Sequence, residues 1–137
     1  GTRSMPTHRE EPIETFKHKM INKPDMNQET AMHCVAGNGY IEPVRLLYQH
    51  GASISVINED EESPLHLAAE AGRTNVVTQL LEWEKKLCLG KDDQGRTPLH
   101  QAAKNGYDLT TTVLVKAGAD LDAKNVYSET PLDCAIK

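Results

Sequence analysis

The chain has 137 residues, of which 38% are apolar and 26% charged, and its formal net charge is −5. This length suits one domain of ordinary size. No apolar run approaches the roughly 18 to 20 residues that a membrane-spanning helix needs, so we expect no membrane contact by this segment. Lysine and arginine are scattered, and the basic face that would neutralise phosphates is missing, so we expect no direct nucleic-acid binding.

The N-terminal segment predicts one amphipathic helix. We interpret residues 1–4, which precede Met5, as a cloning remnant and leave them out. Within residues 5–23, the apolar side chains of Ile13, Phe16 and Met20 fall at helical spacing. We expect this helix to cap the exposed end of the units that follow it; a disordered leader is the alternative.

A stretch of about ten residues then recurs along the chain. The copies read TAMHCVAGNG, SPLHLAAEAG, TPLHQAAKNG and TPLDCAIK. Their first residues are 33, 34 and 33 positions apart, and they are Thr30, Ser63, Thr97 and Thr130. Several matching positions at one fixed period indicate a structural repeat rather than a local site.

Each shared position has a physical role at the start or end of a short helix. The first residue caps the helix with its hydroxyl, and proline suits the next position because its missing N–H costs nothing there. Glycine nine positions after the start favours a left-handed cap at Gly39, Gly72 and Gly106. A second apolar helix follows each time, reading IEPVRLLYQH, TNVVTQLLEW and LTTTVLVKAG.

Helices of this length are marginal in isolation, where about 12 to 15 residues are needed even for good helix formers. One unit is therefore unable to bury its own apolar face. Stacked units achieve this because each covers the next. The sequence thus predicts a solenoid of helix pairs.

The period of 33 residues, with [ST]-P-L-H-x-A-A-x-x-G and a later G-A-[DS], resembles the ankyrin repeat. The resemblance implies an all-α ankyrin-repeat solenoid of stacked helix-turn-helix units with projecting β-hairpin-like loops. It also implies that His33, His66 and His100 tie these loops together through hydrogen bonds and remain buried and neutral. By the same pattern the repeats span residues 24–56, 57–90, 91–123 and, as a partial repeat, 124–137.

The sequence departs from the family pattern in several places. Ala31 stands where proline is usual, and Asp133 stands where histidine is usual. The loop glycine is kept only as Gly95; the residues that replace it are Gln28, Glu61 and Ser128. WEKKLCLG replaces the usual Gly-Ala-Asp ending of the second repeat, so we expect an irregular loop there. Trp83 is interpreted as a local staple for this loop or, alternatively, as a partner contact. Because the last repeat is partial, we expect a fragment of a longer array or of a multidomain protein.

Three cysteines lie far apart without a Cys-x-x-Cys pair, which favours reduced thiols in an intracellular protein, cytoplasmic or nuclear. Cys34 and Cys134 stand beside the repeated motif, and we expect them in the core. Cys88 falls in the irregular loop and is expected to be the most exposed thiol, with a redox role as an alternative.

We expect no metal, cofactor or catalytic centre. Equivalent histidines of stacked helices lie roughly 10 Å apart, whereas zinc needs donors about 2.0 to 2.3 Å from one ion. The sequence lacks Gly-x-Ser-x-Gly, a Cys/His signature and a phosphate-binding loop. Its paired carboxylates fall on solvated loop tips, which do not raise a carboxyl pKa as acid–base catalysis requires.

The strongest surface feature is an acidic run that has no basic residue within it. It comprises Glu59, Asp60, Glu61, Glu62 and Glu70. One interpretation is a negative patch that steers a basic peptide; the other is a solvated loop. The loop of the fourth repeat carries Tyr127, for which we weigh an aromatic interface anchor against packing on a flanking repeat.

The sequence therefore predicts a non-catalytic, monomeric interaction module that binds a protein or peptide on the concave face of the solenoid. The residues expected to carry binding are Glu59, Asp60, Glu62, Leu67, Glu70, Asp93, Arg96, Gln101, Lys104, Asn105 and Tyr127. The alternative is a cytosolic segment of a larger channel or enzyme that transmits conformational change. SPLHLAAEAGRTNVVTQLLEWEKKL followed by TPLHQAAKNG is similar to the ankyrin arrays of TRP-type cation channels.

Overall fold

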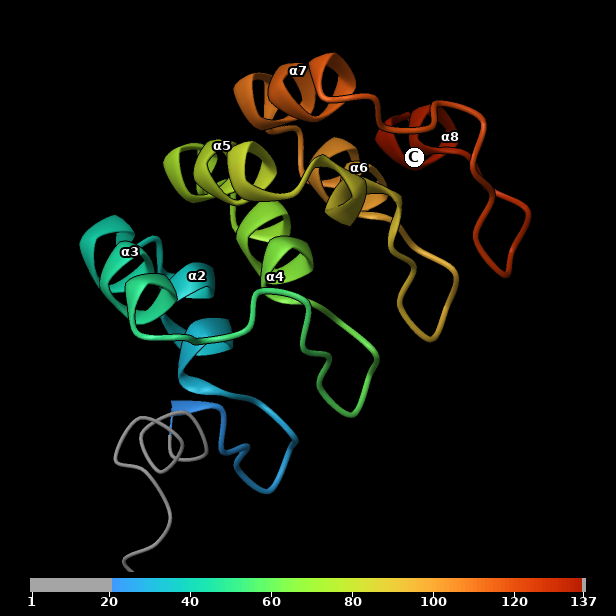
Figure 1. Cartoon of the computed structure of the whole chain (residues 1–137). Coiled ribbons are helices and arrows are strands. Elements are labelled where there is room, and N and C mark those ends of the chain that lie inside the picture. Colours follow the sequence, from blue (N-terminus) through green and yellow to red (C-terminus); the bar gives the residue numbers. More distant parts are fainter. Residues whose placement is uncertain (1–20, 137) are drawn as a thin grey trace, which may run out of the picture.

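The computed structural model describes residues 21–136, and from α2 to α8 the pairs of helices are stacked from left to upper right in Figure 1. The predicted N-terminal helix, with Ile13, Phe16 and Met20, lies outside these residues. The elements are α2 (Ala31–Asn38), α3 (Ile41–Gln49), α4 (Pro64–Glu70), α5 (Thr74–Trp83), the 3₁₀ helix η2 (Lys85–Leu89), α6 (Pro98–Lys104), α7 (Asp108–Lys116) and α8 (Pro131–Ala135). Between residues 21 and 136 no helix combines the length and apolarity that a membrane crossing requires.

The helices form two layers, and extended loops project from one side of them (Figure 1). The first helices of successive units pack in one row, α2 on α4, α4 on α6, and α6 on α8. The second helices form the other row, in which α5 packs on both α3 and α7. This arrangement is the all-α solenoid of stacked helix pairs that the sequence predicts.

Each first-row helix begins with the same reciprocal pair of hydrogen bonds. The hydroxyl oxygens of Thr30, Ser63 and Thr97 accept the backbone N–H of the histidine three residues later, and the histidine ring accepts the cap residue's own N–H. At the fourth copy Asp133 replaces the histidine and its carboxylate accepts the N–H of Thr130. Capping of this kind satisfies two backbone donors that the helix itself leaves unpaired.

The core is a continuous apolar column between the two layers. Leu65 and Leu99 from the first row and Leu80 and Leu114 from the second row are almost completely buried. Alanines at the predicted positions, including Ala68 and Ala102, are fully buried and leave room for the neighbouring helices to approach. Most of this core joins different repeats, so burial stabilises the stack rather than any single unit.

The segment after Trp83 departs from the other repeats, as predicted, but it is compact. The chain forms η2 and turns Cys88 inward, leaving only 2% of that residue exposed. The expectation that Cys88 is the most exposed thiol is therefore wrong. Burial also raises the pKa of its thiol, which lowers its reactivity and opposes the redox role.

The other two cysteines were also misplaced by the sequence analysis. Cys34 is exposed and Cys134 is half-buried, although both were expected in the core. They occupy the position after His33 and, in the fourth copy, after Asp133. Leu67 and Gln101 occupy the equivalent positions of the middle repeats.

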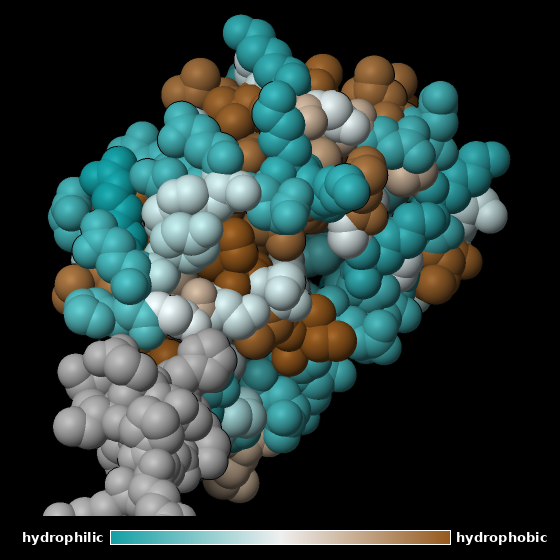
Figure 2. All heavy atoms as spheres, in the orientation of Figure 1, coloured by the Kyte–Doolittle hydropathy of each residue, from teal (hydrophilic) through white to brown (hydrophobic). Residues whose placement is uncertain are grey.

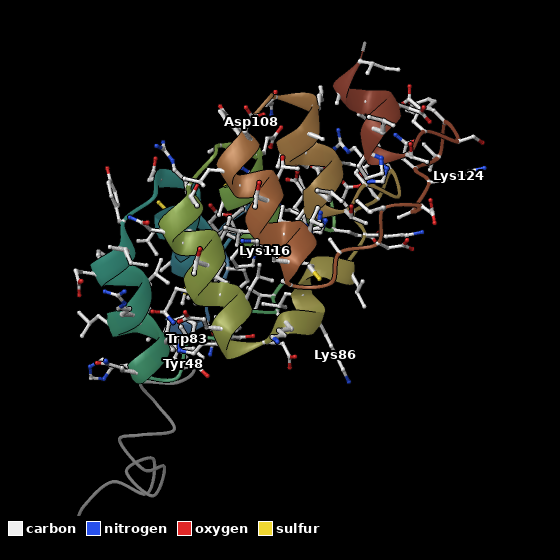
Figure 3. The ribbon with its side chains drawn as sticks, turned by 90° about the horizontal axis from the view of Figure 1, so that it is seen from above. Tyr48, Trp83, Lys86, Asp108, Lys116 and Lys124 are labelled. Carbon is white, nitrogen blue, oxygen red and sulfur yellow. The ribbon has the colours of Figure 1, made fainter. Side chains whose placement is uncertain are left out.

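Trp83 joins the first and second repeats. Its ring stacks on Tyr48 at the end of α3, with 3.8 Å between ring centroids and 11° between the planes, and Figure 3 shows the two side chains together. Aromatic stacking adds about 0.5 to 1.5 kcal/mol beyond the area buried. Trp83 is thus a staple between repeats.

The projecting loops share one left-handed backbone position. Gly95 has φ 72°, and the residues that replace glycine in the other loops adopt φ values of 61° to 64°; they are Gln28, Glu61 and Ser128. Such a conformation costs a residue with a Cβ roughly 1 to 2 kcal/mol. The loops therefore keep one backbone shape even where the side chain disfavours it.

We predict that Gly95→Ala destabilises the fold more than Gly106→Ala. The two glycines have nearly equal φ values, 72° and 74°. A Cβ at position 95 meets the Asn125 Cα at 3.2 Å and the Val126 nitrogen at 3.3 Å, whereas a Cβ at position 106 meets nothing within 4 Å. We expect about 1 kcal/mol lost for Gly106→Ala and about 1 kcal/mol more for Gly95→Ala, measured by urea unfolding. Equal losses would contradict the close packing of the loops.

Candidate binding surface

Four loops, at residues 24–29, 57–62, 91–96 and 124–129, form the projecting edge of the molecule; we call them hairpins 1 to 4. The second residue of each is an aspartate or asparagine whose side-chain oxygen accepts the backbone N–H groups two and four residues later, at 2.8 to 2.9 Å. These residues are Asp25, Asn58, Asp92 and Asn125. Sequence reasoning missed them, although they recur at the same period of 33 or 34 residues as the helix motif.

Neighbouring hairpins are joined to each other near their tips. The N–H of Glu59 donates to the Asn27 carbonyl at 3.0 Å, and the N–H of Asp93 donates to the Asp60 carbonyl at 3.0 Å. The third link runs from the Val126 N–H to the Gln94 carbonyl at 2.9 Å. Backbone bonds of this kind fix the spacing of the hairpins whatever side chains they carry.

The motif histidines make the second connection between hairpins, as the family resemblance implied. Nδ1 of His66 accepts the Ser63 N–H at 3.2 Å, and its Nε2 bonds the Arg96 carbonyl in hairpin 3 at 2.9 Å. His33 and His100 repeat this pattern toward the carbonyls of Glu62 and Glu129, each at 2.8 Å. Because Nδ1 is an acceptor and a carbonyl is an acceptor, the single proton of the neutral ring lies on Nε2.

Burial favours the neutral form of two of these rings. It lowers the pKa of His66 and of His100, although the negative charge of Asp92 acts in the opposite direction on both. A proton added at Nδ1 would also face the N–H that this atom accepts. The neutral ring is therefore the form that holds the hairpins together.

The predicted acidic residues lie on hairpin 2 and the adjoining helix. Glu59, Asp60 and Glu70 are exposed, and Glu62 is half-buried. We call these four residues the acidic cluster. Desolvation by burial raises the pKa of Glu62, and the negative charges of Glu70, Asp60 and Asp92 raise it further, although a hydrogen bond from Asn58 acts in the opposite direction. The structure thus brings negative charge from hairpin 2 and α4 to one place, beside the Asp92–Arg96 ion pair of hairpin 3.

The predicted contacts of the third repeat have different surroundings. Asp93 and Lys104 are exposed. The Nε of Arg96 is committed to the buried carboxylate of Asp92 at 2.8 Å. Asn105 is exposed, but its amide donates to the Glu70 carbonyl at 3.0 Å and so links two helices. Gln101 was predicted on the surface and is instead completely buried.

Two further predicted contacts are apolar or aromatic. Leu67 is half-buried on α4, and Tyr127 is 69% exposed at the tip of hairpin 4 beside exposed Val126. Hydrophilic residues cover most of the face drawn in Figure 2, and hydrophobic residues form separate patches on it. Tyr127 and Val126 therefore form an exposed pair of an aromatic and an apolar side chain at the tip of hairpin 4.

A cavity of about 390 Å³ lies between hairpins 3 and 4. Its walls come from the hairpins and from α6 and α8, and its lining includes Gln94, Arg96, Gln101, Tyr127, Glu129 and Cys134. The Cys134 thiol donates to the Glu129 carboxylate at 3.9 Å. The structure thus gathers four sequence-predicted residues, Arg96, Gln101, Lys104 and Tyr127, around one hollow.

Repeated helix pairs with loops tied to one another define a helical-repeat solenoid, an architecture of the protein-interaction type. Comparison with known families agrees with this class. The pattern described as "Ankyrin repeats (3 copies)" matches residues 9–89, and the pattern described as "Ankyrin repeat" matches residues 94–126. The chain belongs to the ankyrin-repeat family.

Similar stretches occur in longer proteins. Over 123 residues the chain is 52% identical to the transient receptor potential cation channel subfamily A member 1 homolog of Caenorhabditis elegans, a match that covers 90% of this chain and 10% of that relative. It is 36% identical over 103 residues to the human subfamily A member 1 channel, which covers 74% of this chain and 9% of the relative. It is 32% identical over 106 residues to the probable 26S proteasome regulatory subunit p28 of Saccharomyces cerevisiae, 73% of this chain and 46% of the relative. The chain thus spans about a tenth of the two channel relatives.

We predict that the His66 bridge makes stability depend on pH. The folded-state pKa of His66 is lowered, so the unfolded chain binds protons more readily below about 6.5. The stability contributed by neutral His66 is therefore complete above that pH and is lost as the pH falls through the lowered pKa. Glu62 has the opposite sign, because its folded pKa is raised, so the test compares variants rather than one profile.

The measurement is urea unfolding at pH 7.5 and at pH 5.5. His66→Ala should lower the free energy of unfolding by about 2 to 4 kcal/mol at pH 7.5, from lost hydrogen bonds and lost packing. It should also reduce the loss of stability between the two pH values. His50→Ala, at an exposed histidine outside the motif, is the control and should behave as the wild type. A wild-type pH dependence in His66→Ala would contradict the bridge.

Proposed function

We propose that this chain is an intracellular protein-interaction module whose concave face, formed by the hairpins and the first-row helices, binds a protein segment rich in basic residues. The observation that supports this most directly is the acidic cluster, in which Glu59, Asp60 and Glu70 are exposed around half-buried Glu62. Burial is the main cause of the raised pKa of Glu62, and the negative charges of Glu70 and Asp60 raise it further. A basic side chain placed among these groups would relieve that repulsion.

The hairpins favour binding because they are already ordered before a partner arrives. The backbone links from Asn27 to Glu59 and from Asp60 to Asp93 hold hairpin 2 between its neighbours. Binding to such a surface has little ordering cost in the loops. Charge complementarity then raises the association rate and selects basic partners, and salt weakens both effects.

The test is binding of a fluorescein-labelled nona-arginine peptide, followed by anisotropy at low and at physiological salt. We expect Glu59→Lys combined with Asp60→Lys to weaken binding about tenfold, since two exposed negative charges become positive. These residues contribute only backbone groups to the hydrogen bonds between hairpins, so the frame should remain intact.

The matched control combines Glu82→Lys with Asp122→Lys. Both residues are exposed, and they lie on α5 and on the loop between α7 and hairpin 4, outside the acidic cluster. The control has the same net charge as the test variant, and we expect its affinity within about twofold of the wild type. Equal weakening in the two variants would show that net charge alone attracts the peptide, which would overturn the proposal.

A second candidate is a segment of a larger cation channel that passes conformational change along an ankyrin array. The identity of 52% with the Caenorhabditis elegans channel homolog favours it. Exposed apolar side chains, Leu132 on α8 at 69% and Ile136 directly after it at 75%, offer a face on which a further repeat would stack. The sequence of the complete protein decides between the candidates: six membrane-spanning helices beyond this segment support the channel, and their absence removes it.

A further inference from the structure

The side chain of Gln101 is buried without the partners that burial normally requires. The residue has no exposed surface, and neither its Nε2 nor its Oε1 has a hydrogen-bond partner among residues 21–136. A carboxamide offers two donors and an acceptor, and each buried group left unpaired costs roughly 1 to 3 kcal/mol. Leucine serves at the equivalent position of the second repeat, Leu67. Glutamine at position 101 therefore costs stability that the repeat architecture does not demand.

The residue that carries the unpaired amide lines a cavity. Gln101 is part of the lining of the cavity between hairpins 3 and 4, whose volume of about 390 Å³ falls in the range of roughly 300 to 1,000 Å³ found for ligand sites. Because the Gln101 amide has no exposed surface, a ligand reaches it only when neighbouring side chains move aside. Gln94, Lys104 and Tyr127 share the cavity lining and are exposed. Their side chains extend from the surface and can change rotamer without disturbing the frame.

The two free atoms of the amide restrict the chemistry of the ligand. A carboxylate accepts from Nε2 and leaves Oε1 without a donor, and an ammonium group donates to Oε1 and leaves Nε2 unpaired. A group that presents an N–H and a C=O side by side satisfies both. In a peptide, this arrangement comes from the carboxamide of asparagine or glutamine or from the backbone of one extended residue.

We propose that the cavity between hairpins 3 and 4 receives an amide group of the partner peptide, which pairs with both Oε1 and Nε2 of Gln101. This deepens the proposed function and rests on its premise that a peptide lies along the concave face. The ring of Tyr127 covers the same segment from the tip of hairpin 4. Gln101 is thus the specificity-determining residue, and the acidic cluster supplies the charge attraction.

The distance between the acidic cluster and Gln101 predicts how far apart the two recognised residues lie in the partner peptide. Gln101 and the acidic cluster belong to adjacent repeats, whose helices α4 and α6 are packed together. Packed helices are about 8 to 10 Å apart, and an extended peptide rises about 3.3 Å per residue. A basic residue and the amide that binds Gln101 should therefore be about three positions apart in the partner.

Stability gives the first test. Gln101→Leu removes the unpaired amide and places at this position the residue type found at position 67, so we expect the urea midpoint to rise by about 0.5 M. A fall in the midpoint would show that the amide is satisfied in the free protein, for example by a bound water, and would overturn the proposal.

Binding gives the second test, with the whole chain labelled with ¹⁵N and the Gln101 side-chain amide signals assigned by their loss in Gln101→Leu. The probe is the neutral peptide acetyl-Ala-Ala-Gln-Ala-Ala N-methylamide, whose caps contain no primary amide. We expect a saturable shift of the Gln101 signals in the millimolar range. A version with arginine three positions from the glutamine should bind about tenfold more tightly, and this gain should vanish in Glu59→Lys combined with Asp60→Lys.

Peptides with leucine or glutamate in place of the central glutamine separate the sources of the amide. Shifts that persist with leucine assign the pairing to the peptide backbone, and shifts lost with leucine assign it to the glutamine side chain. If no peptide moves the Gln101 signals, the inference fails. If nona-arginine still binds the acidic cluster in that case, the proposed function stands without this inference. If nona-arginine does not bind while the neutral peptide does, the preference for basic partners is wrong and the amide site remains.

Discussion

The imidazole that joins one repeat to the next is the interaction on which the rest of the structure depends. Through Nδ1 each motif histidine completes the cap of its own helix, and through Nε2 it holds the hairpin of the following repeat. The helices are too short to be stable alone, and the hairpins have no core of their own. One buried ring therefore forms hydrogen bonds with a backbone N–H at the start of a helix and with a backbone carbonyl of a loop. The second of these bonds forms only when the next repeat is in place.

The groups that hold the repeats together, which we call the frame, are thus different from the side chains that form the surface. The links between hairpins use main-chain atoms, and the histidine bridges and the turns at Asn58, Asp92 and Asn125 use buried side chains. The outward side chains of the hairpins are then free to differ, and here they carry the charges of Glu59 and Asp60 and the ring of Tyr127. Gln101 is the exception, because a frame position holds a polar group that the frame leaves unpaired. Such a conflict between stability and local structure is expected at functional sites.

The repeat motif predicts most of the fold, because each of its features acts over a few residues and recurs in every repeat. Caps, first-turn prolines and left-handed glycines act within a few residues, so the helices, their starts and their ends follow from the sequence. The aspartate or asparagine of each hairpin recurs with the same period. Comparing the four repeats at every aligned position would have found it. Glu61 and Ser128 stand at the position that Gly95 occupies in its repeat. They adopt the same left-handed conformation as Gly95, since the shared loop shape overrides the preference of the side chain.

The burial of single residues at the open edge was not predictable in this way. Cys88 turns inward because η2 folds back on the stack, and Gln101 is buried where α6 packs on α8 beside two hairpins. Both outcomes depend on packing between segments distant in sequence, which periodicity does not describe. The acidic run could be read from the sequence, but its convergence with Asp92 from another hairpin could not.

The central claim is most directly tested by the tautomeric state of the bridging rings. Long-range ¹H–¹⁵N correlation spectra at pH 7.5 distinguish protonated from unprotonated imidazole nitrogens for each histidine. The account predicts the neutral tautomer with the proton on Nε2 and an unprotonated Nδ1 for His33, His66 and His100. A proton on Nδ1, or the exchange-averaged signals of a free imidazole, would show that these rings do not connect the repeats.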